Sequence, residues 1–141
     1  MKQRLSFRPA EGEDAVLVDM WVEPGGGVPP HVHPSMEERF EVISGELSFL
    51  AGRKWQTAGA GETVVVPAGT RHAYRNSGAK PAHGVCHASP PQSLEEFLTD
   101  AAAMARDGKI TRHGLPKSPP ALLQVLRLAL RHRRMVVMRP L

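Results

Sequence analysis

Alternating apolar and polar positions dominate the first 89 residues of the chain. Residues 15–23 place Val16, Val18 and Met20 on one side and Asp19 on the other. A period of two with β-branched residues is typical of a strand that buries one face. Further β-like runs, separated by turns rich in glycine and proline, occur at residues 38–43, 46–50, 53–57, 63–66, 71–76 and 82–88. Many short strands joined by such turns predict an all-β sandwich or barrel.

Beyond residue 89 the apolar residues recur at helical spacing. Ser93, followed by Glu96 three residues later, has the pattern of a capping box, in which the serine side chain satisfies a backbone N–H group at the helix start. Asp107 and Gly108 end the apolar pattern, and glycine is the usual residue just after a helix. The sequence therefore predicts a helix between these two signals.

A second helix is expected at about residues 120–134, after a proline-rich link. Its polar positions share one stripe, and leucine-rich positions cover the rest. Because so wide an apolar surface is unstable in water, we expect this helix to be docked on its own barrel, a second subunit or a membrane surface. Together the patterns predict two α-helices in a C-terminal extension over residues 90–141, packed on a barrel over residues 1–89 or at a dimer interface.

Length and composition exclude several classes of protein. With 141 residues, 41% of them hydrophobic, the chain can form one domain with a substantial core. Its 23% charged residues and mean hydropathy of −0.28 argue against both a disordered and an integral membrane protein. No apolar run reaches the roughly 20 residues of a transmembrane helix, and no signal peptide is visible. We therefore expect a cytoplasmic protein without a transmembrane segment.

Charge is distributed unevenly along the chain. Residues 1–107 hold 10 basic and all 14 acidic residues, whereas residues 108–141 hold eight basic residues and no acidic one. Such a tail could attract the phosphates of nucleic acid or anionic lipid, although a solvated basic helix on its own domain is the simpler interpretation. The sequence has no recognised DNA-reading element, and no strand-edge aromatic residues interleave with basic ones as single-strand binders require, so no nucleic-acid partner is expected.

Three histidines and one glutamate are candidate metal ligands. His31 and His33 are separated by one residue, so strand alternation directs both imidazoles to the same side. Glu38 shares a strand face with apolar residues, and a buried carboxylate needs a cation or a hydrogen-bond partner. His72 can join them if it also points inward. Such a nitrogen and oxygen ligand set suits divalent Mn, Fe, Co, Ni, Cu or Zn better than Ca or Mg.

The order and spacing of these residues resemble two motifs of the cupin superfamily. Residues 25–45 are similar to the first motif, in which a glycine precedes HxH by five residues, a glutamate follows, and a second glycine comes six residues later. The second motif, G-x5-P-x-G-x2-H-x3-N, is matched by Gly61, Pro67, Gly69, His72 and Asn76. The resemblance covers about residues 15–88. It implies a double-stranded β-helix, a jelly-roll barrel, with one metal ion held in its mouth by His31, His33, Glu38 and His72.

The resemblance implies a metalloenzyme, dioxygenase-like or isomerase-like, that acts on a small organic molecule in the barrel. A non-catalytic module that binds or senses a small molecule through the metal is the alternative, because fold does not fix function. The family resemblance also favours a homodimer formed through barrel strands.

Four further residues bear on the chemistry of the barrel. Tyr74 shares the face of His72 and is the candidate catalytic residue, to orient a ligand or to serve as an acid, although its ring could simply fill the barrel. His83 and His87 share one strand face and could contact a ligand, but surface or half-buried positions are the simpler expectation. Cys86 is the single cysteine, which excludes an internal disulfide. It alternates away from those histidines and is expected to be a structural thiol.

Overall fold

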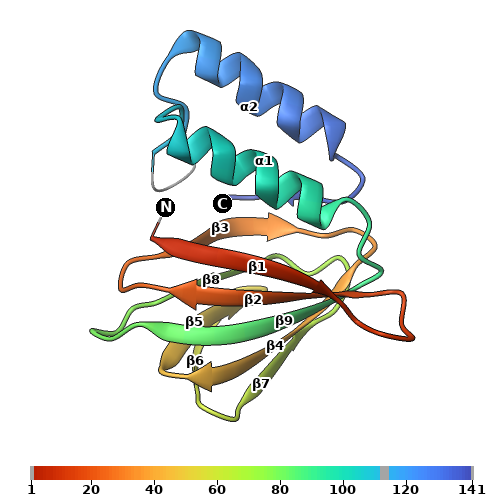
Figure 1. Ribbon diagram of the computed structural model, residues 1–141, viewed down its shortest axis with the longest axis vertical. Helices are drawn as coiled ribbons and strands as arrows, with labels where there is room; N and C mark the ends of the chain where they lie inside the picture. The colour runs from red at the N-terminus through yellow and green to blue at the C-terminus, as the bar shows by residue number, and fades with distance from the viewer. Residues whose placement is uncertain (1, 112–114, 141) are drawn as a thin grey trace.

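Two antiparallel five-stranded sheets pack face to face as a barrel (Figure 1). The computed structural model describes residues 2–111 and 115–140. The first sheet has the order β1-β2-β9-β4-β7, with β1 (Gln3–Pro9), β2 (Val16–Val22), β9 (Ala82–Ser89), β4 (Glu37–Ser44) and β7 (Thr63–Val66). The second has the order β10-β3-β8-β5-β6, with β10 (Val137–Met138), β3 (Gly27–Val32), β8 (His72–Arg75), β5 (Glu46–Ala51) and β6 (Lys54–Gly59). The predicted all-β barrel is confirmed.

Strict alternation of burial explains why these segments form strands. Every second residue of β2 and β9 is buried, as is every second residue through most of β4, while the residues between them are half-buried or exposed. The apolar side chains between the sheets form the core, in which Met20, Val42, Leu47 and Phe49 are at most 2% exposed. Burial of each such side chain contributes about 1.5–3 kcal/mol, so the core fixes the register of every strand that supplies it.

Strands β1 and β10 were not predicted from the sequence, and of β3 only the part around His31 was. In β1, Gln3, Leu5 and Phe7 are half-buried and alternate with exposed residues, but the first of the three is polar, so only two apolar positions mark the pattern. The β10 strand is two residues long and pairs with β3 far back in the sequence. The predicted boundary between barrel and C-terminal extension at residue 89 stays a proposal. Strand β10 belongs to the extension in sequence but pairs with the barrel.

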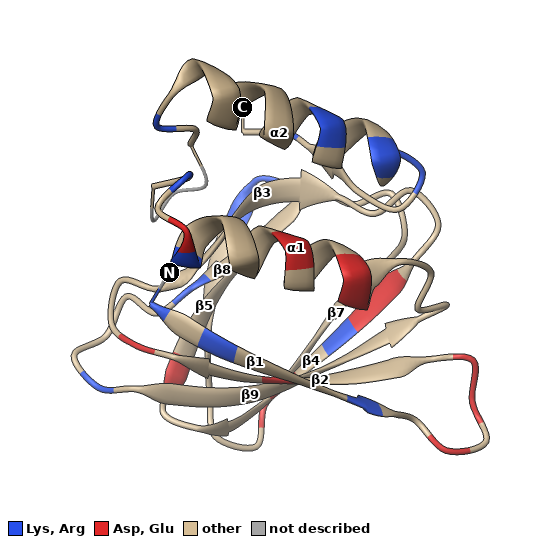
Figure 2. Cartoon of the chain, turned by 45° about the horizontal axis from the view of Figure 1, so that its top comes forward, with Lys and Arg blue, Asp and Glu red and all other residues tan. Residues whose placement is uncertain are grey.

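Two helices cover one end of the barrel, close to β1 and β3 (Figures 1 and 2). Helix α1 (Leu94–Arg106) is followed by Asp107 and by Gly108, which has a φ of 69°, as the sequence predicts. Helix α2 (Pro119–Arg131) begins after Ser118, whose hydroxyl accepts a hydrogen bond from the Ala121 N–H. It ends three residues before the predicted end. Within the described ranges, no helix is long and apolar enough to cross a membrane.

The capping box predicted at the start of α1 is wrong. The helix does begin after Ser93, but the Ser93 side chain caps no backbone N–H group. Its hydroxyl is instead 2.7 Å from Nδ1 of the buried His132, which directly follows α2. A tertiary contact between the two helices has therefore replaced the local hydrogen bond that the sequence pattern suggests.

Candidate metal centre

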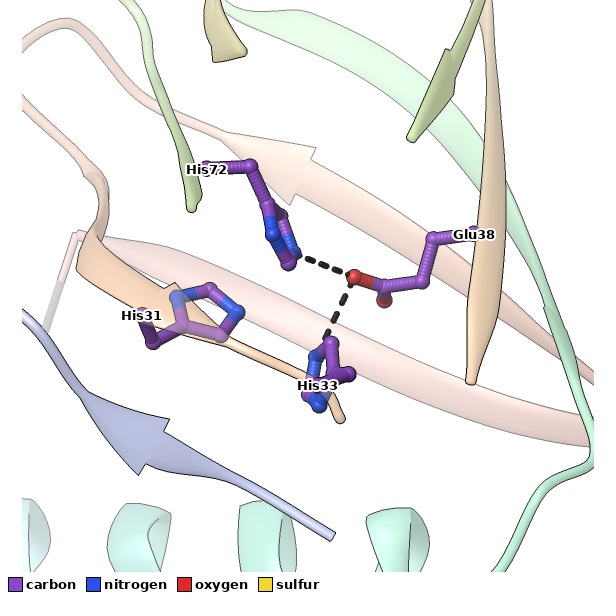
Figure 3. Close-up of side chains that lie close together, drawn as sticks. All are labelled: His31, His33, Glu38 and His72. Carbon is purple, nitrogen blue, oxygen red and sulfur yellow. Dashed lines mark hydrogen bonds and ion pairs between the residues drawn. The ribbon is translucent and has the colours of Figure 1, made fainter. Parts of the chain in front are cut away.

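One cluster brings together the four predicted ligands from three parts of the barrel (Figure 3). One side-chain donor atom each from His31, His33, Glu38 and His72 lies within 4.8 Å of all the others. His31 and His72 face each other across the β3–β8 pair, and Glu38 enters from β4 in the opposite sheet. Three of the side chains are buried, and His31 is half-buried.

Strand alternation predicted that both histidines of the first motif lie on one strand, but only His31 does. Strand β3 ends at Val32, so His33 lies just beyond it. The register of β3 also shifts between Val28 and His31. Pro29 and Pro30 occupy this gap, and proline has no N–H to give to a strand ladder. The imidazoles still converge, because the ring centroids of His31 and His33 are 4.8 Å apart.

Backbone carbonyl groups orient all three imidazoles. Each Nδ1 lies 2.8 Å from a backbone carbonyl oxygen. The carbonyl belongs to Pro29 for His31, to Thr70 for His72 and to Met135 for His33. A carbonyl only accepts hydrogen bonds, so each Nδ1 carries the proton and donates it. In the neutral ring Nε2 therefore has the free lone pair. This arrangement is typical of metal-binding histidines, whose orientation and tautomer are set by a second hydrogen bond.

Glu38 supplies the charge that the imidazoles face. Its Oε1 is 2.6 Å from Nε2 of His72 and 3.2 Å from Nε2 of His33. A lone pair on each Nε2 would repel a carboxylate at these distances, so a cation, either a proton or a metal ion, belongs between them. The donor atoms present fit a divalent transition metal, because neutral imidazoles and one carboxylate are its usual ligands.

Without a metal ion, the electrostatics of the cluster favour a neutral His31 and an ionised Glu38, as metal binding needs, whereas at His33 they favour the proton that a metal ion would replace. Burial, together with the neighbouring His72 and His33, lowers the pKa of His31 to about 3, so this ring is neutral near pH 7. Burial opposes ionisation of Glu38, but hydrogen bonds and charges from His33 and His72 outweigh it and hold its pKa well below the usual value. Burial also lowers the pKa of His33, but its bond to Glu38 reverses this and leaves that pKa raised.

Cys86 contacts the cluster, which the sequence analysis did not anticipate. Its thiol lies 3.2 Å from Oε2 of Glu38 and donates to it. Burial and the nearby Glu38 raise the pKa of this thiol, so it stays protonated. The contact arises because β9 pairs with β4, where Cys86 lies opposite Phe40. Only the strand order of the folded sheet shows this, so no sequence signal could have revealed it.

The Cys86→Ser variant is expected to keep both the fold and the metal. A serine hydroxyl can replace the thiol as donor to Glu38, whereas Cys86→Ala leaves Oε2 without that bond and should weaken metal binding about tenfold. Competition with a chromophoric chelator measures both affinities. If Cys86→Ser alone removes the metal, the sulfur is itself a ligand and the four-residue assignment is incomplete.

The other candidate side chains lie apart from the cluster or beside it. His83 and His87 lie on the outer face of β9, near Asp19 and Glu13 respectively, and are half-buried. Tyr74 is buried in the cavity wall, and its hydroxyl donates to Oε1 of Gln3 at 2.5 Å. Burial, with the charges of Cys86 and Glu38, raises its pKa well above the usual value. The sequence offers no signal for Gln3 beyond its place in the alternation of β1.

A cavity of about 430 Å³ lies between the barrel and the two helices. Its wall contains His31, His33 and Glu38, with Tyr74 and Cys86 also lining it. Most of the remaining wall is apolar, supplied by the barrel and by both helices, and includes Leu5, Val18, Val28, Phe97, Leu98, Ala101, Val125 and Leu128. Three of the four candidate ligands therefore face a largely apolar cavity at the end of the barrel that the helices cover.

The C-terminal segment supports the cluster from outside. The Met135 carbonyl holds His33, 102 residues earlier in the chain. In β10, Met138 pairs with His31 of β3. The Arg71 guanidinium donates to the carbonyls of Arg139 at 2.7 Å and Pro140 at 3.0 Å, which fastens the end of this segment to the start of β8.

Known proteins share both the sequence pattern and the fold. The model of the Cupin_2 family, described as the cupin domain, matches residues 18–87. A protein of Streptomyces cyaneus named polyketide synthase CurC is 30% identical over 109 residues, which cover 72% of this chain and 71% of that protein.

Solved structures agree with this relationship. An uncharacterised protein of Klebsiella pneumoniae with a double-stranded β-helix domain is 30% identical, with a TM-score of 0.53 over 60% of this chain and 84% of that one. KdgF from a Halomonas species is 17% identical and has a TM-score of 0.60 over 67% of this chain and 84% of that one, which shows the shared fold alone. The two motifs, the barrel and these relatives lead to one conclusion: the chain belongs to the cupin superfamily.

Proposed function

We propose that this chain is a metal-dependent enzyme acting on a small, mainly apolar organic molecule that carries oxygen atoms at one end. The observation that carries the proposal is the position of His31, His33 and Glu38 in the wall of an otherwise largely apolar cavity. Apolar walls hold the body of a ligand, and a few polar groups at one place fix its orientation. The oxygen-bearing end of the substrate therefore belongs at the metal centre.

His31, His33, Glu38 and His72 are the residues we assign to hold the metal, one divalent ion of Mn, Fe, Co, Ni, Cu or Zn. When bound, this ion supplies Lewis-acid or redox chemistry at the oxygen-bearing end of the substrate. The protein contributes the rest: carbonyl groups orient the imidazoles, and the Cys86 thiol donates to Glu38. Helices α1 and α2 supply part of the apolar wall against which the bound molecule would pack.

We assign Tyr74 a positioning role rather than that of an acid. Its raised pKa keeps the hydroxyl protonated, and its O–H group already donates to Gln3. Because Tyr74 and Gln3 both line the cavity, a substrate oxygen can take the place of Gln3 as acceptor. The phenol would then orient the substrate through a hydrogen bond without giving up its proton.

The similarity to a protein named polyketide synthase supports the substrate class. Polyketide chains carry carbonyl groups on alternate carbon atoms, and two such oxygens together form a good chelating group for a divalent metal. Their hydrocarbon portion suits the apolar wall. We therefore favour a β-diketone or enol as the reacting end, with dioxygenase-like cleavage or isomerisation as the reaction.

Dibenzoylmethane, an apolar β-diketone, is a suitable probe of this proposal. Zinc-loaded protein is expected to bind it at least about tenfold more tightly than metal-free protein, because only the loaded centre can take both oxygens. Titration calorimetry measures the two affinities. The matched control is 1,3-diphenylpropane, which has no oxygen atoms and should bind both forms equally. Equal affinities for dibenzoylmethane would contradict the proposed orientation.

The same probe separates an enzyme from a non-catalytic binding or sensing module. After incubation with iron- or manganese-loaded protein in air, mass spectrometry is expected to find converted dibenzoylmethane. Full recovery of the probe despite tight binding would favour the sensing alternative. A homodimer and a cytoplasmic location stay predictions from the sequence.

A further inference from the structure

Helix α2 has two apolar faces, and the barrel uses only one of them. Ala121 is buried, and Val125, Leu128 and Ala129 line the cavity. The adjoining side carries a surface that we call the outer leucine face, consisting of Leu122, Leu123, Leu126 and Leu130, which are 46%, 49%, 51% and 61% exposed. The fold of this chain does not require leucines there. We propose that the outer leucine face docks on an anionic membrane surface.

The leucines form a continuous strip rather than scattered exposed residues. Leu122, Leu126 and Leu130 are four residues apart and follow one another along the helix, with Leu123 beside them. A helix of 13 residues is about 20 Å long, too short to span a bilayer, whereas a helix that lies in the bilayer surface is defined by its apolar face and not by its length. An exposed apolar strip of this kind marks a contact with a partner or a membrane.

Charge favours a membrane over a second copy of the chain. Arg127 is exposed beside the outer leucine face, and Arg133 and Arg134 follow the end of the helix. Residues 108–141 contain no acidic residue and carry eight basic ones, and Figure 2 shows only basic charge on α2. Symmetric pairing of two such helices would bring like charges together. Anionic lipid headgroups instead match the arginines while the leucines enter the apolar boundary.

The nearest acidic residues of the chain are already engaged. Arg131 lies 3.7 Å from Glu96 and 3.8 Å from Asp100, both on α1. These contacts direct Arg131 toward α1, and Arg133 donates to the Leu130 carbonyl, whereas Arg127 and Arg134 are exposed and form no ion pair with a described residue. Docking would place the helix that roofs the apolar cavity on a membrane, where apolar molecules concentrate. Only this last consequence rests on the proposed function; the docking itself does not.

Vesicle sedimentation with the full chain tests the proposal. We expect binding to vesicles of equal parts phosphatidylglycerol and phosphatidylcholine, at least about tenfold weaker binding to phosphatidylcholine alone, and release at high salt. Absence of binding to the anionic vesicles, or equal binding to both kinds, would overturn the proposal.

Paired substitutions locate the contact. Leu126→Gln with Leu130→Gln should weaken binding to the anionic vesicles at least about tenfold, since both leucines lose their transfer into the membrane boundary. The matched control is Ile43→Gln with Val65→Gln, which changes side chains of similar exposure, 43% and 50%, on the barrel and should leave binding unchanged. Circular dichroism checks that both variants are folded. Unchanged binding of the leucine variant contradicts the proposal. The proposal is also contradicted if the wild type is a dimer and the leucine variant is a monomer, because a second copy of the chain would then cover the outer leucine face.

Discussion

Replacing His31 by alanine, alone and together with His72→Ala, is expected to remove the metal from the purified protein. The wild type, purified without chelators or added metal, should contain close to one transition-metal ion per chain. Loss of a residue that only hydrogen-bonds to a metal ligand typically weakens metal binding roughly 10- to 100-fold, and loss of a ligand itself should weaken it more. The double variant should contain no bound metal. Elemental analysis by mass spectrometry measures the content. Affinity alone favours copper or zinc in vitro, so the identity of the metal and its content are measured separately.

The single variant His31→Ala tests the metal site with less effect on the metal-free fold than the double variant. His31 makes no hydrogen bond to Glu38, whereas His72 does, so His72→Ala removes a partner of a buried carboxylate and destabilises the metal-free fold as well. The matched control is His87→Ala, which removes a half-buried imidazole on the outer face of β9. Metal content that survives His31→Ala with His72→Ala would show that the cluster is not the metal site.

Ala101→Trp is expected to block the cavity without disturbing the metal centre. Ala101 lies on α1 in the cavity wall, and an indole there would occupy space that the apolar part of a ligand needs. We expect the affinity for dibenzoylmethane to fall at least about tenfold, equivalent to about 1.4 kcal/mol, while metal content stays unchanged. Because the indole enters an existing cavity, stability should change by less than the roughly 1–3 kcal/mol typical of overpacking.

The control for this substitution is Thr99→Trp. Thr99 is exposed on the same helix and does not line the cavity, so the added ring should affect neither metal nor probe. Titration calorimetry with the metal-loaded proteins compares the two variants directly. Unchanged probe affinity in Ala101→Trp would show that apolar ligands bind elsewhere, and the substrate assignment would then fail even if the metal site is correct.

The sequence by itself determined the barrel and the membership of the candidate site. Burial alternates every second residue in β2 and β9, and this local pattern can be recognised without knowledge of any neighbour. The four candidate ligands were predictable because they occupy fixed positions of the two cupin motifs, and the structure brings them together. The end of α1 at Gly108 was predictable for a similar reason, since its positive φ is a property of that position.

Tertiary structure decided what surrounds the site. The Met135 carbonyl that orients His33 and the Cys86 thiol that touches Glu38 come from segments 102 and 48 residues away. Ser93, predicted to cap α1, bonds instead to His132 beyond α2. In each case a polar group has several acceptable partners of similar energy, and only the packed arrangement of strands and helices selects one. The apolar cavity has the same origin, because it lies between elements that local patterns cannot place relative to one another.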